Sequence, residues 1–276
     1  MKGPTLDEAT FHNLRRRITD ASGIHVIADE NSRFLLERRL ASRLRVQGVT
    51  SFSEYESTLD DKELDAMLDV VAVHETYFFR EKRQLKAFSE HIIPELAQSS
   101  RPFKIWSAGC STGEEAYTIA MLLSEQGLLG EGRSQVIASD LSNRVIGSGI
   151  RGVYSATSFR TTEPQFREGY FTEAEHGLWR ANDALRSSVQ FEQANLMGIS
   201  TQTKEGASPA EGGFDVIFCR NVLMYFDEAA VKKTLNAIHS LLREGGYLLL
   251  GHAESLLPIG LGYESVQIGR ELIHRK

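Results

Sequence analysis

Residues 104–121, KIWSAGCSTGEEAYTIAM, decide the fold of this chain. An apolar run ends in a turn that holds Gly109 and Gly113, and Glu114 and Glu115 then open an apolar helical stretch. In an α/β sheet, this order of strand, turn and helix presents backbone N–H groups to a ligand at the carboxyl end of a strand. The glycines would allow a tight turn and leave space that side chains would otherwise fill. Because the full G-x-G-x-x-G pattern is absent, the turn alone indicates either a nucleoside ligand or a plain connection.

The composition is that of an ordinary globular protein. With 276 residues, 41% hydrophobic and 25% charged, the chain can form one large domain or two modest ones. No apolar run is long enough to cross a bilayer, and the polar N-terminus lacks the apolar core of a signal peptide, so we expect a cytoplasmic protein without membrane insertion. Cys110 and Cys219 lie far apart, which predicts neither a disulfide framework nor a metal site. The net charge of −6 argues against general nucleic-acid binding.

From residue 103 onward, strand patterns alternate with helix patterns. We expect strands at 103–108, 135–139, 188–193, 214–219 and 247–251, with an antiparallel edge pair within 263–274. Helices at 114–124, 141–149 and 227–242 separate them. This alternation predicts an α/β fold with a parallel sheet and right-handed crossovers. Residues 154–194 interrupt the alternation, and within them residues 170–182 resemble a hairpin or short strands with the turn at 176–177.

Asp140 ends the second predicted strand. An acidic residue at this position can accept hydrogen bonds from both hydroxyls of a ribose. The alternative is that Asp140 caps the next helix.

The first 70 residues have helical spacing, and one helix is rich in arginine. Its arginines face a single acidic residue, Glu37, within residues 33–45; they are Arg33, Arg38, Arg39, Arg43 and Arg45. They form a solvated face with internal ion pairs, a docking face for an acidic partner, or a nucleic-acid surface. Neither interleaved aromatic residues nor a recognised nucleic-acid fold supports the last of these.

Several motifs now occur together and in order: ETYFFRE at 75–81, WSAGCSTGEEAYTIA at 106–120, IASD at 137–140, FDVIFCRNVLMYFD at 214–227 and GGYLLLGHAES at 245–255. Together they resemble the chemotaxis receptor glutamate O-methyltransferases, the CheR family, which use S-adenosylmethionine. The resemblance implies a small helical receptor-docking domain at 1–73, a linker segment and helix at 74–102, and a Rossmann-like class I methyltransferase domain at 103–276. The inserted β-subdomain then occupies about 154–188.

The resemblance also implies roles for individual residues. Arg220 and Tyr225 would be catalytic, the five arginines named above would dock the substrate, and no metal is involved. The cofactor-binding residues would be His74, Thr76, Arg80, Ala108, Gly109, Glu115, Asp140, Asn195, Leu196, Arg220 and Asn221. His74 departs from the family pattern, which usually has Asn there, although histidine can still donate or accept one hydrogen bond.

The chemistry agrees with this assignment. A sulfonium methyl group is already an activated electrophile and a glutamate is ionised at neutral pH, so methyl transfer needs positioning and the removal of water, with no general base. Arg220 could hold the substrate carboxylate, and Tyr225 could orient the methyl donor or simply pack at the start of a helix. The products would be a glutamate methyl ester and S-adenosylhomocysteine.

The implied partners are the cytoplasmic domains of methyl-accepting chemotaxis receptors, which are acidic helical bundles, bound by a monomeric enzyme. The segment 172–177 is shorter than in family members that grip a receptor's C-terminal pentapeptide, so we expect activity independent of that peptide. The rival interpretations are a non-catalytic module that binds S-adenosylmethionine and a methyltransferase for another substrate. A nicotinamide dehydrogenase is a third, but the chain lacks its full glycine fingerprint.

Overall fold

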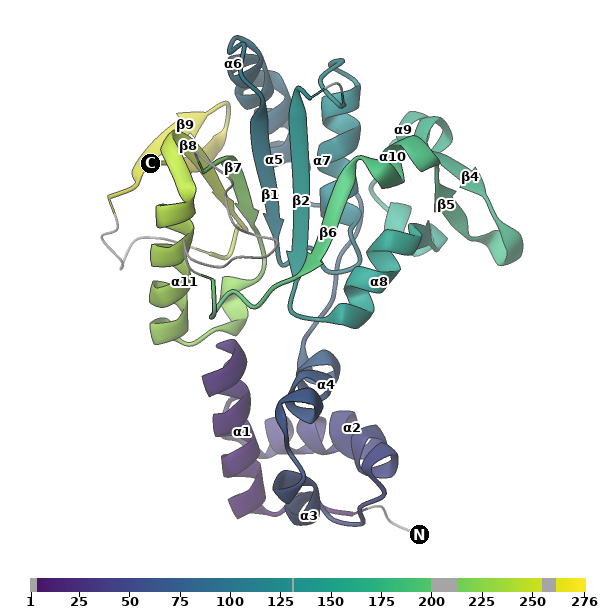
Figure 1. The fold of residues 1–276 in the computed structure, drawn as a ribbon, viewed down its shortest axis with the longest axis vertical. Coiled ribbons are helices and arrows are strands. Elements are labelled where there is room, and N and C mark those ends of the chain that lie inside the picture. Colours follow the sequence, from purple (N-terminus) through teal and green to yellow (C-terminus); the bar gives the residue numbers. More distant parts are fainter. Residues whose placement is uncertain (1–3, 131, 200–212, 255–261) are drawn as a thin grey trace. The chain divides into compact units, whose positions relative to one another are not determined.

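The strands predicted after residue 102 form one seven-stranded sheet in the order β6-β2-β1-β7-β8-β10-β9 (Figure 1). The structure is a computed structural model, and it describes residues 4–130, 132–199, 213–254 and 262–276. The strands are β1 (Phe103–Ala108), β2 (Ser134–Asp140), β6 (Val189–Gln193), β7 (Phe214–Cys219), β8 (Leu242–Leu250), β9 (Glu264–Ile268) and β10 (Glu271–Arg275). Strands β6 to β8 in this order are parallel, and β10 pairs antiparallel with both β8 and β9. The predicted parallel sheet with an antiparallel edge pair is therefore confirmed. The strand order reverses between β1 and β7, which is where ligands bind in open α/β sheets.

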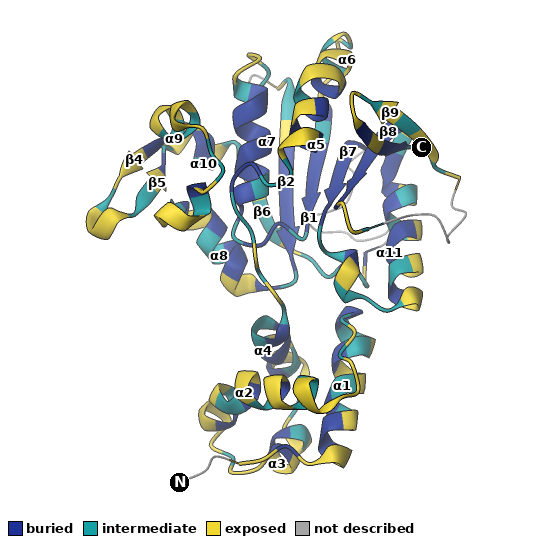
Figure 2. Ribbon diagram, turned by 180° about the vertical axis from the view of Figure 1, so that it is seen from behind, coloured by how far each residue is buried: buried dark blue, intermediate teal, exposed yellow. Residues whose placement is uncertain are grey.

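Helices cover both faces of this sheet. They are α5 (Lys82–Ala87), the π-helix η1 (Phe88–Ile92), α6 (Ile93–Ala97), α7 (Glu114–Ser124), α8 (Asn143–Arg151) and α11 (Glu228–Leu241). The central strands β1, β2, β7 and β8 and the inner sides of α5 and α7 are largely buried (Figure 2). Phe88 of η1 meets Phe218 of β7 edge to face, with ring centroids 5.0 Å apart. Full burial of such side chains stabilises the fold by about 1.5–3 kcal/mol each, so this packing holds the ends of the strands in place.

The interruption of the alternation forms a separate three-stranded sheet in the order β3-β5-β4. Its strands and helices are β3 (Val153–Tyr154), η2 (Ala156–Phe159), α9 (Pro164–Tyr170), β4 (Phe171–Glu173), η3 (Glu175–Gly177), β5 (Trp179–Ala181) and α10 (Asp183–Ser187). His176 and Gly177 both have positive φ, as the predicted hairpin turn requires. The ring of Phe78 lies 4.8 Å from that of Tyr154, 4.8 Å from that of Phe159 and 5.1 Å from that of Phe171. The first phenylalanine of ETYFFRE is thus a core residue that ties the inserted sheet to the segment before α5.

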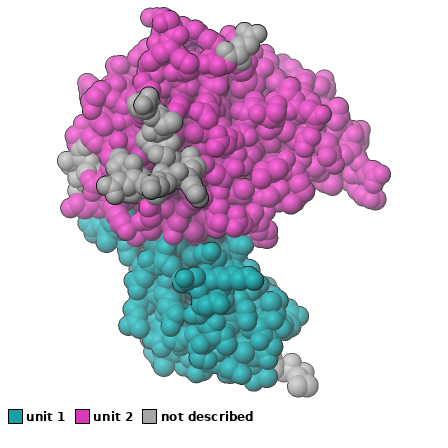
Figure 3. All heavy atoms as spheres, viewed as in Figure 1, with its two compact units in different colours: residues 1–73, 225–231 teal, residues 74–224, 232–276 magenta. Residues whose placement is uncertain are grey.

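The N-terminal helices belong to a second compact unit, made of residues 1–73 and 225–231 (Figure 3). The helices before residue 74 are α1 (Glu8–Ser22), α2 (Glu30–Gln47), α3 (Phe52–Ser57) and α4 (Asp61–Val71). Each of these helices begins at a capping residue whose side chain accepts a hydrogen bond from a backbone N–H of the first turn. The capping residues are Asp7, Asp29, Ser51 and Asp60. The segment 225–231 joins this unit through an antiparallel bridge between Ile24 and Phe226. The helical unit is therefore built from two separate parts of the chain.

Candidate functional site

The glycine turn after β1 is held against the end of β2. The N–H of Gly109 donates to the carbonyl of Ser139 at 2.8 Å, and φ is +79° at Gly109 and +94° at Gly113, as the predicted tight turn requires. A Cβ at Gly109 would lie 2.5 Å from Val222 Cγ2, and one at Gly113 would lie 2.9 Å from the Phe191 ring. The expectation that these glycines leave space for a ligand is therefore wrong. They let the turn pack closely against its protein neighbours.

Asp140, at the end of β2, keeps acceptor capacity for a ligand. Its Oδ2 accepts from Ser111 N at 2.9 Å and its Oδ1 from Ser142 N at 3.0 Å. A carboxylate offers about four acceptor positions, and among the described residues Asp140 forms no ion pair. Ser142, rather than Asp140, caps α8 by accepting from Val145 N. Asp140 is therefore not the helix cap, and its remaining acceptor positions fit the two hydroxyl donors of a ribose.

The segment from His74 to Arg80 lies beside the glycine turn. The Ser111 hydroxyl donates to the His74 carbonyl at 3.1 Å. Arg80 donates to the Glu75 carbonyl at 2.9 Å, and Thr76 between them is partly buried. The backbone of His74 therefore faces the turn that carries Ala108 and Gly109.

The two acidic residues that open α7 have different surroundings. Glu114 is buried and accepts from the hydroxyls of Thr112 and Ser158, and burial raises its pKa. Glu115 accepts from Ser107 Oγ at 2.6 Å and from Arg220 Nε at 2.7 Å. Only Glu115 thus faces the end of β7.

Arg220 follows β7 and has a side chain that is only 2% exposed. Besides Glu115, its Nη1 donates to the Arg80 carbonyl at 3.1 Å and lies 3.5 Å from Glu81 Oε2 and from Gln84 Oε1. Burial alone would raise the pKa of Glu81, but the charge of Arg220 and the hydrogen bonds to this carboxylate lower it. Within the described ranges, Nη2 of Arg220 donates no hydrogen bond, so it remains available to a ligand.

Asn221 connects Arg220 to residues that sequence reasoning missed. It has φ of +60°, its Nδ2 donates to Glu81 Oε1 at 3.2 Å, and its N–H donates to Glu254 at 2.8 Å. Glu81 ends the ETYFFRE motif and Glu254 lies in GHAES. The available signal was the carboxylate near the end of each of these two motifs.

Asn195 and Leu196 follow β6 and complete the row of strand ends. The N–H of Ala194 donates to the Asp140 carbonyl at 3.0 Å, and Asn195 Oδ1 accepts from Met197 N at 3.0 Å. The structure therefore brings the predicted cofactor residues of four neighbouring strands to one edge of the sheet. Tyr225 belongs instead to the segment of the helical unit, where its carbonyl accepts from His25 N at 2.6 Å.

Two family models match this chain in sequence order. The model "CheR methyltransferase, all-alpha domain" matches residues 9–72, and "CheR methyltransferase, SAM binding domain" matches residues 74–267. The chain belongs to the CheR methyltransferase family. It is accordingly a methyltransferase that uses S-adenosylmethionine.

Curated CheR relatives are similar over most of their length. The chemotaxis protein methyltransferase of Borreliella burgdorferi is 32% identical, with 82% of each chain covered. Chemotaxis protein methyltransferase 2 of Vibrio cholerae is 33% identical over 85% of this chain and 82% of its own. The Escherichia coli chemotaxis protein methyltransferase is 34% identical over 91% of this chain and 85% of its own. The similarity therefore extends over both CheR domains.

In the helical CheR domain, the five arginines of α2 fall into two groups. Arg43 pairs with the buried Glu63, and Arg39 donates to the Val71 carbonyl. Arg33 forms only an exposed ion pair with Glu30, at 3.5 Å. In the part of the chain that the structure describes, Arg38 and Arg45 form no ion pair. Only Arg33, Arg38 and Arg45 are therefore available to a partner without breaking a buried contact.

Exposed apolar side chains lie on the same helix. Phe34, Leu35 and Val46 are each more than half exposed, and the Arg38 guanidinium lies 5.7 Å from the Phe34 ring. The exposed surface of α2 is thus both basic and apolar.

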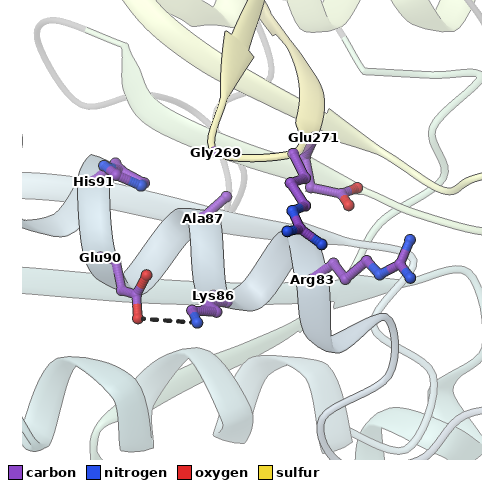
Figure 4. A pocket seen from close by; sticks show the side chains of 8 residues that line it. Arg83, Lys86, Ala87, Glu90, His91, Gly269 and Glu271 are labelled. Carbon is purple, nitrogen blue, oxygen red and sulfur yellow. Dashed lines mark ion pairs between the residues drawn. The ribbon is translucent and has the colours of Figure 1, made fainter.

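The SAM-binding domain also has a groove of about 430 Å³ (Figure 4). Its lining comes from α5, η1 and the β9–β10 turn: Arg83, Lys86, Ala87, Glu90, His91, Gly269, Arg270 and Glu271. Lys86 and Glu90, four residues apart on the same helical wall of the groove, pair with each other at 3.7 Å. None of the predicted site residues is among those that line this groove.

Residues 4–130, 132–199, 213–254 and 262–276 offer neither a metal-binding cluster nor a membrane-spanning helix. Within these ranges no three His, Cys, Asp or Glu side chains are grouped so that they could hold a metal ion. No helix in them combines the length and the apolar character that a membrane span requires.

Proposed function

We propose that this enzyme transfers the methyl group of S-adenosylmethionine to glutamate side chains in the cytoplasmic domains of methyl-accepting chemotaxis receptors. The products are glutamate methyl esters, which serve signalling adaptation, and S-adenosylhomocysteine. The observation that carries the proposal is the match of both CheR models over residues 9–72 and 74–267, in line with relatives named chemotaxis protein methyltransferases. The proposal then assigns a task in this reaction to each of the residues at the sheet edge.

The cofactor residues have distinct tasks in this proposal. Asp140 accepts hydrogen bonds from the two ribose hydroxyls with the acceptor positions that Ser111 and Ser142 leave unused. Asn195 and Leu196 contact the adenine side. The remaining cofactor contacts come from His74, Thr76, Arg80, Ala108, Gly109, Glu115 and Asn221. When bound, S-adenosylmethionine supplies a positively charged sulfonium whose methyl group is an activated electrophile.

Arg220 holds the substrate carboxylate. Its Nε and Nη1 are occupied by Glu115, Arg80, Glu81 and Gln84, which fix the plane of the guanidinium, while Nη2 is available to donate to the substrate. A charge-assisted bond from a fixed donor orients the attacking oxygen. In this proposal Tyr225 orients the methyl donor.

No acid–base pair is needed for this transfer, because the attacking carboxylate is already ionised and no proton moves in the step. Cys219, next to Arg220, is fully buried, and burial raises the pKa of its thiol well above its ordinary value. It is therefore unsuited to act as a nucleophile.

Receptor docking is assigned to α2, with Arg33, Arg38 and Arg45 as the residues that meet acidic side chains of the receptor. Their charge favours an acidic helical bundle, and an exposed electrostatic contact is weakened by salt. Residues 1–73 then form the docking domain, 74–102 the linker and its helix, and 103–276 the catalytic domain. We further propose that the enzyme is a cytoplasmic monomer that does not depend on a receptor's C-terminal pentapeptide.

The test is incubation of the purified protein with methyl-labelled S-adenosylmethionine and a panel of receptor cytoplasmic fragments. We expect base-labile label that is released as methanol, and we expect Arg220→Lys to lower its formation while S-adenosylmethionine still binds in calorimetry. Cofactor binding without labile label on any receptor would support a non-catalytic module instead. Base-stable label, or label on a small carboxylate only, would support a methyltransferase with another substrate. Tight calorimetric binding of a receptor pentapeptide would contradict the proposed independence.

A further inference from the structure

The carboxylate of Glu254 collects four backbone N–H groups at the end of the sheet. Its Oε2 accepts from Gly251 N at 2.7 Å and from Asn221 N at 2.8 Å. Its Oε1 accepts from Val222 N at 2.8 Å and from Met224 N at 3.2 Å. Three of these donors lie in the turn after β7, so a single side chain binds most of the N–H groups of that turn.

This turn needs an acceptor of this kind. It leaves the strand at Asn221, a non-glycine residue with φ of +60°. Such a conformation costs free energy and persists only where the surroundings enforce it. A carboxylate can accept several N–H bonds at once, and charge-assisted bonds are roughly twice as strong as neutral ones. Glu254 therefore supplies the acceptors that hold the strained turn.

The end of β8 lies very close to this turn. A Cβ at Gly251 would lie 2.6 Å from Asn221 Nδ2, 2.9 Å from Asn221 N and 2.9 Å from Glu254 Oε2. The end of β8 and the turn after β7 are thus packed backbone against backbone. A displacement of Glu254 would move Asn221 with it.

The same turn positions two parts of the site. Arg220, which precedes it, binds Glu115 at 2.7 Å. Val222, within it, fills the space beside Gly109, where an added Cβ would lie 2.5 Å away. The turn consequently links the guanidinium after β7 to the glycine turn after β1.

We propose that Glu254 is a positioning residue for methyl transfer, acting by fixing Arg220, Asn221 and Val222 through the backbone of their turn. It makes no contact with the reacting groups in this role. The inference rests on the proposed function, in which Arg220 holds the substrate carboxylate.

The test compares Glu254→Gln and Glu254→Asp with the control Glu264→Gln. The control residue is an exposed glutamate of β9 whose side chain forms no hydrogen bond or ion pair with the described residues. The glutamine is isosteric, but its NH₂ group would face two of the N–H donors, whereas the aspartate keeps the charge on a shorter stem. Measurements are hydrogen exchange of the peptide that covers residues 220–224, S-adenosylmethionine affinity by calorimetry, and kcat with a receptor fragment.

For Glu254→Gln we expect exchange in this peptide to accelerate about tenfold or more while exchange in β7 is unchanged. We expect kcat to fall about 10–100-fold, because an ångström-scale displacement costs rate on this order. Cofactor affinity should fall much less than kcat, because the ribose contact Asp140 is untouched and Asn221 is one of several cofactor contacts, and Glu254→Asp should restore part of kcat. The control should match the wild type in all three measurements.

Unchanged exchange in the 220–224 peptide would overturn the proposal, and so would faster exchange with unchanged kcat. Parallel losses of kcat, cofactor affinity and folded fraction would show a merely structural role, which also overturns it. If Glu254→Gln does not fold, Glu254→Asp decides by the same criteria. A wild-type enzyme that binds cofactor but methylates no receptor would refute the proposed function, whereas the exchange data would still report on the turn.

Discussion

Replacing Arg43 by alanine should destabilise the helical unit, although Arg43 looks like one member of an exposed basic stripe. Its Nε and Nη2 donate to the two oxygens of Glu63 at 2.9 and 2.5 Å. The side chains are 19% and 4% exposed, so this is a largely buried bidentate pair. Removing one partner of a buried pair costs about 3–5 kcal/mol, because the other charge is left buried. Tyr55 and Gln47 would still donate to Glu63, which places the expected loss near the lower limit, about 3 kcal/mol.

Urea denaturation followed by far-ultraviolet circular dichroism measures this loss, with Arg38→Ala as the matched control. Arg38 lies on the same helix, is exposed and forms no ion pair with the described residues, so its replacement should change the free energy of unfolding by less than about 0.5 kcal/mol. Arg38→Glu and Arg45→Glu should instead reduce receptor methylation and weaken its salt dependence. A loss below about 1 kcal/mol for Arg43→Ala would refute the assignment of Arg43 to stability.

Three further predictions follow from the described side chains. Asp140→Asn should weaken S-adenosylmethionine binding about 10–100-fold in calorimetry, since hydrogen bonds to a charged acceptor contribute about 1.5–3 kcal/mol; unchanged affinity would exclude a ribose contact. Gly113→Ala should cost about 2 kcal/mol in the free energy of unfolding, because φ is +94° and the Phe191 ring lies 2.9 Å from the added Cβ. Gly48→Ala, with φ of +70° and no atom within 4 Å, should cost less. Burial raises the pKa of Glu192 from 4.5 to about 7, so the folded state binds an extra proton between these values. Stability should therefore fall as pH rises through this window, and Glu192→Gln should flatten the dependence of the melting temperature on pH.

Local patterns in the sequence predicted much of the fold. The periods of the apolar residues place β1, α7, β2 and β7 within a few positions of their observed bounds, because the period of a strand or helix is a property of neighbouring residues. The same patterns put Asp140 and Arg220 at the ends of parallel strands, where they meet at one edge of the sheet. The motifs also identified the CheR family, which the matches over residues 9–72 and 74–267 confirm.

The predicted α2 surface shows where a local pattern is insufficient. Periodicity places five arginines on one helix but does not say which of them has a buried partner. Arg43 pairs with Glu63, which lies 20 residues further along the chain. Arg39 donates to the carbonyl of Val71, which lies 32 residues further along. The division into stabilising and available arginines follows from how α2 packs against α4.

The sequence by itself therefore determined the order of the strands and helices along the chain, the family, and which residues follow the strands at the sheet edge. Only the tertiary structure decided that Glu115 rather than Glu114 meets Arg220, 105 residues away, and that the glycines of the turn accommodate Val222 and Phe191. It also brought Glu254 to the backbone N–H of Asn221 across 33 residues, and Glu81 to the side chain of Asn221 across 140. The physical reason is that these bonds depend on which strand ends lie next to each other in the folded sheet. Packing over the whole domain fixes that arrangement.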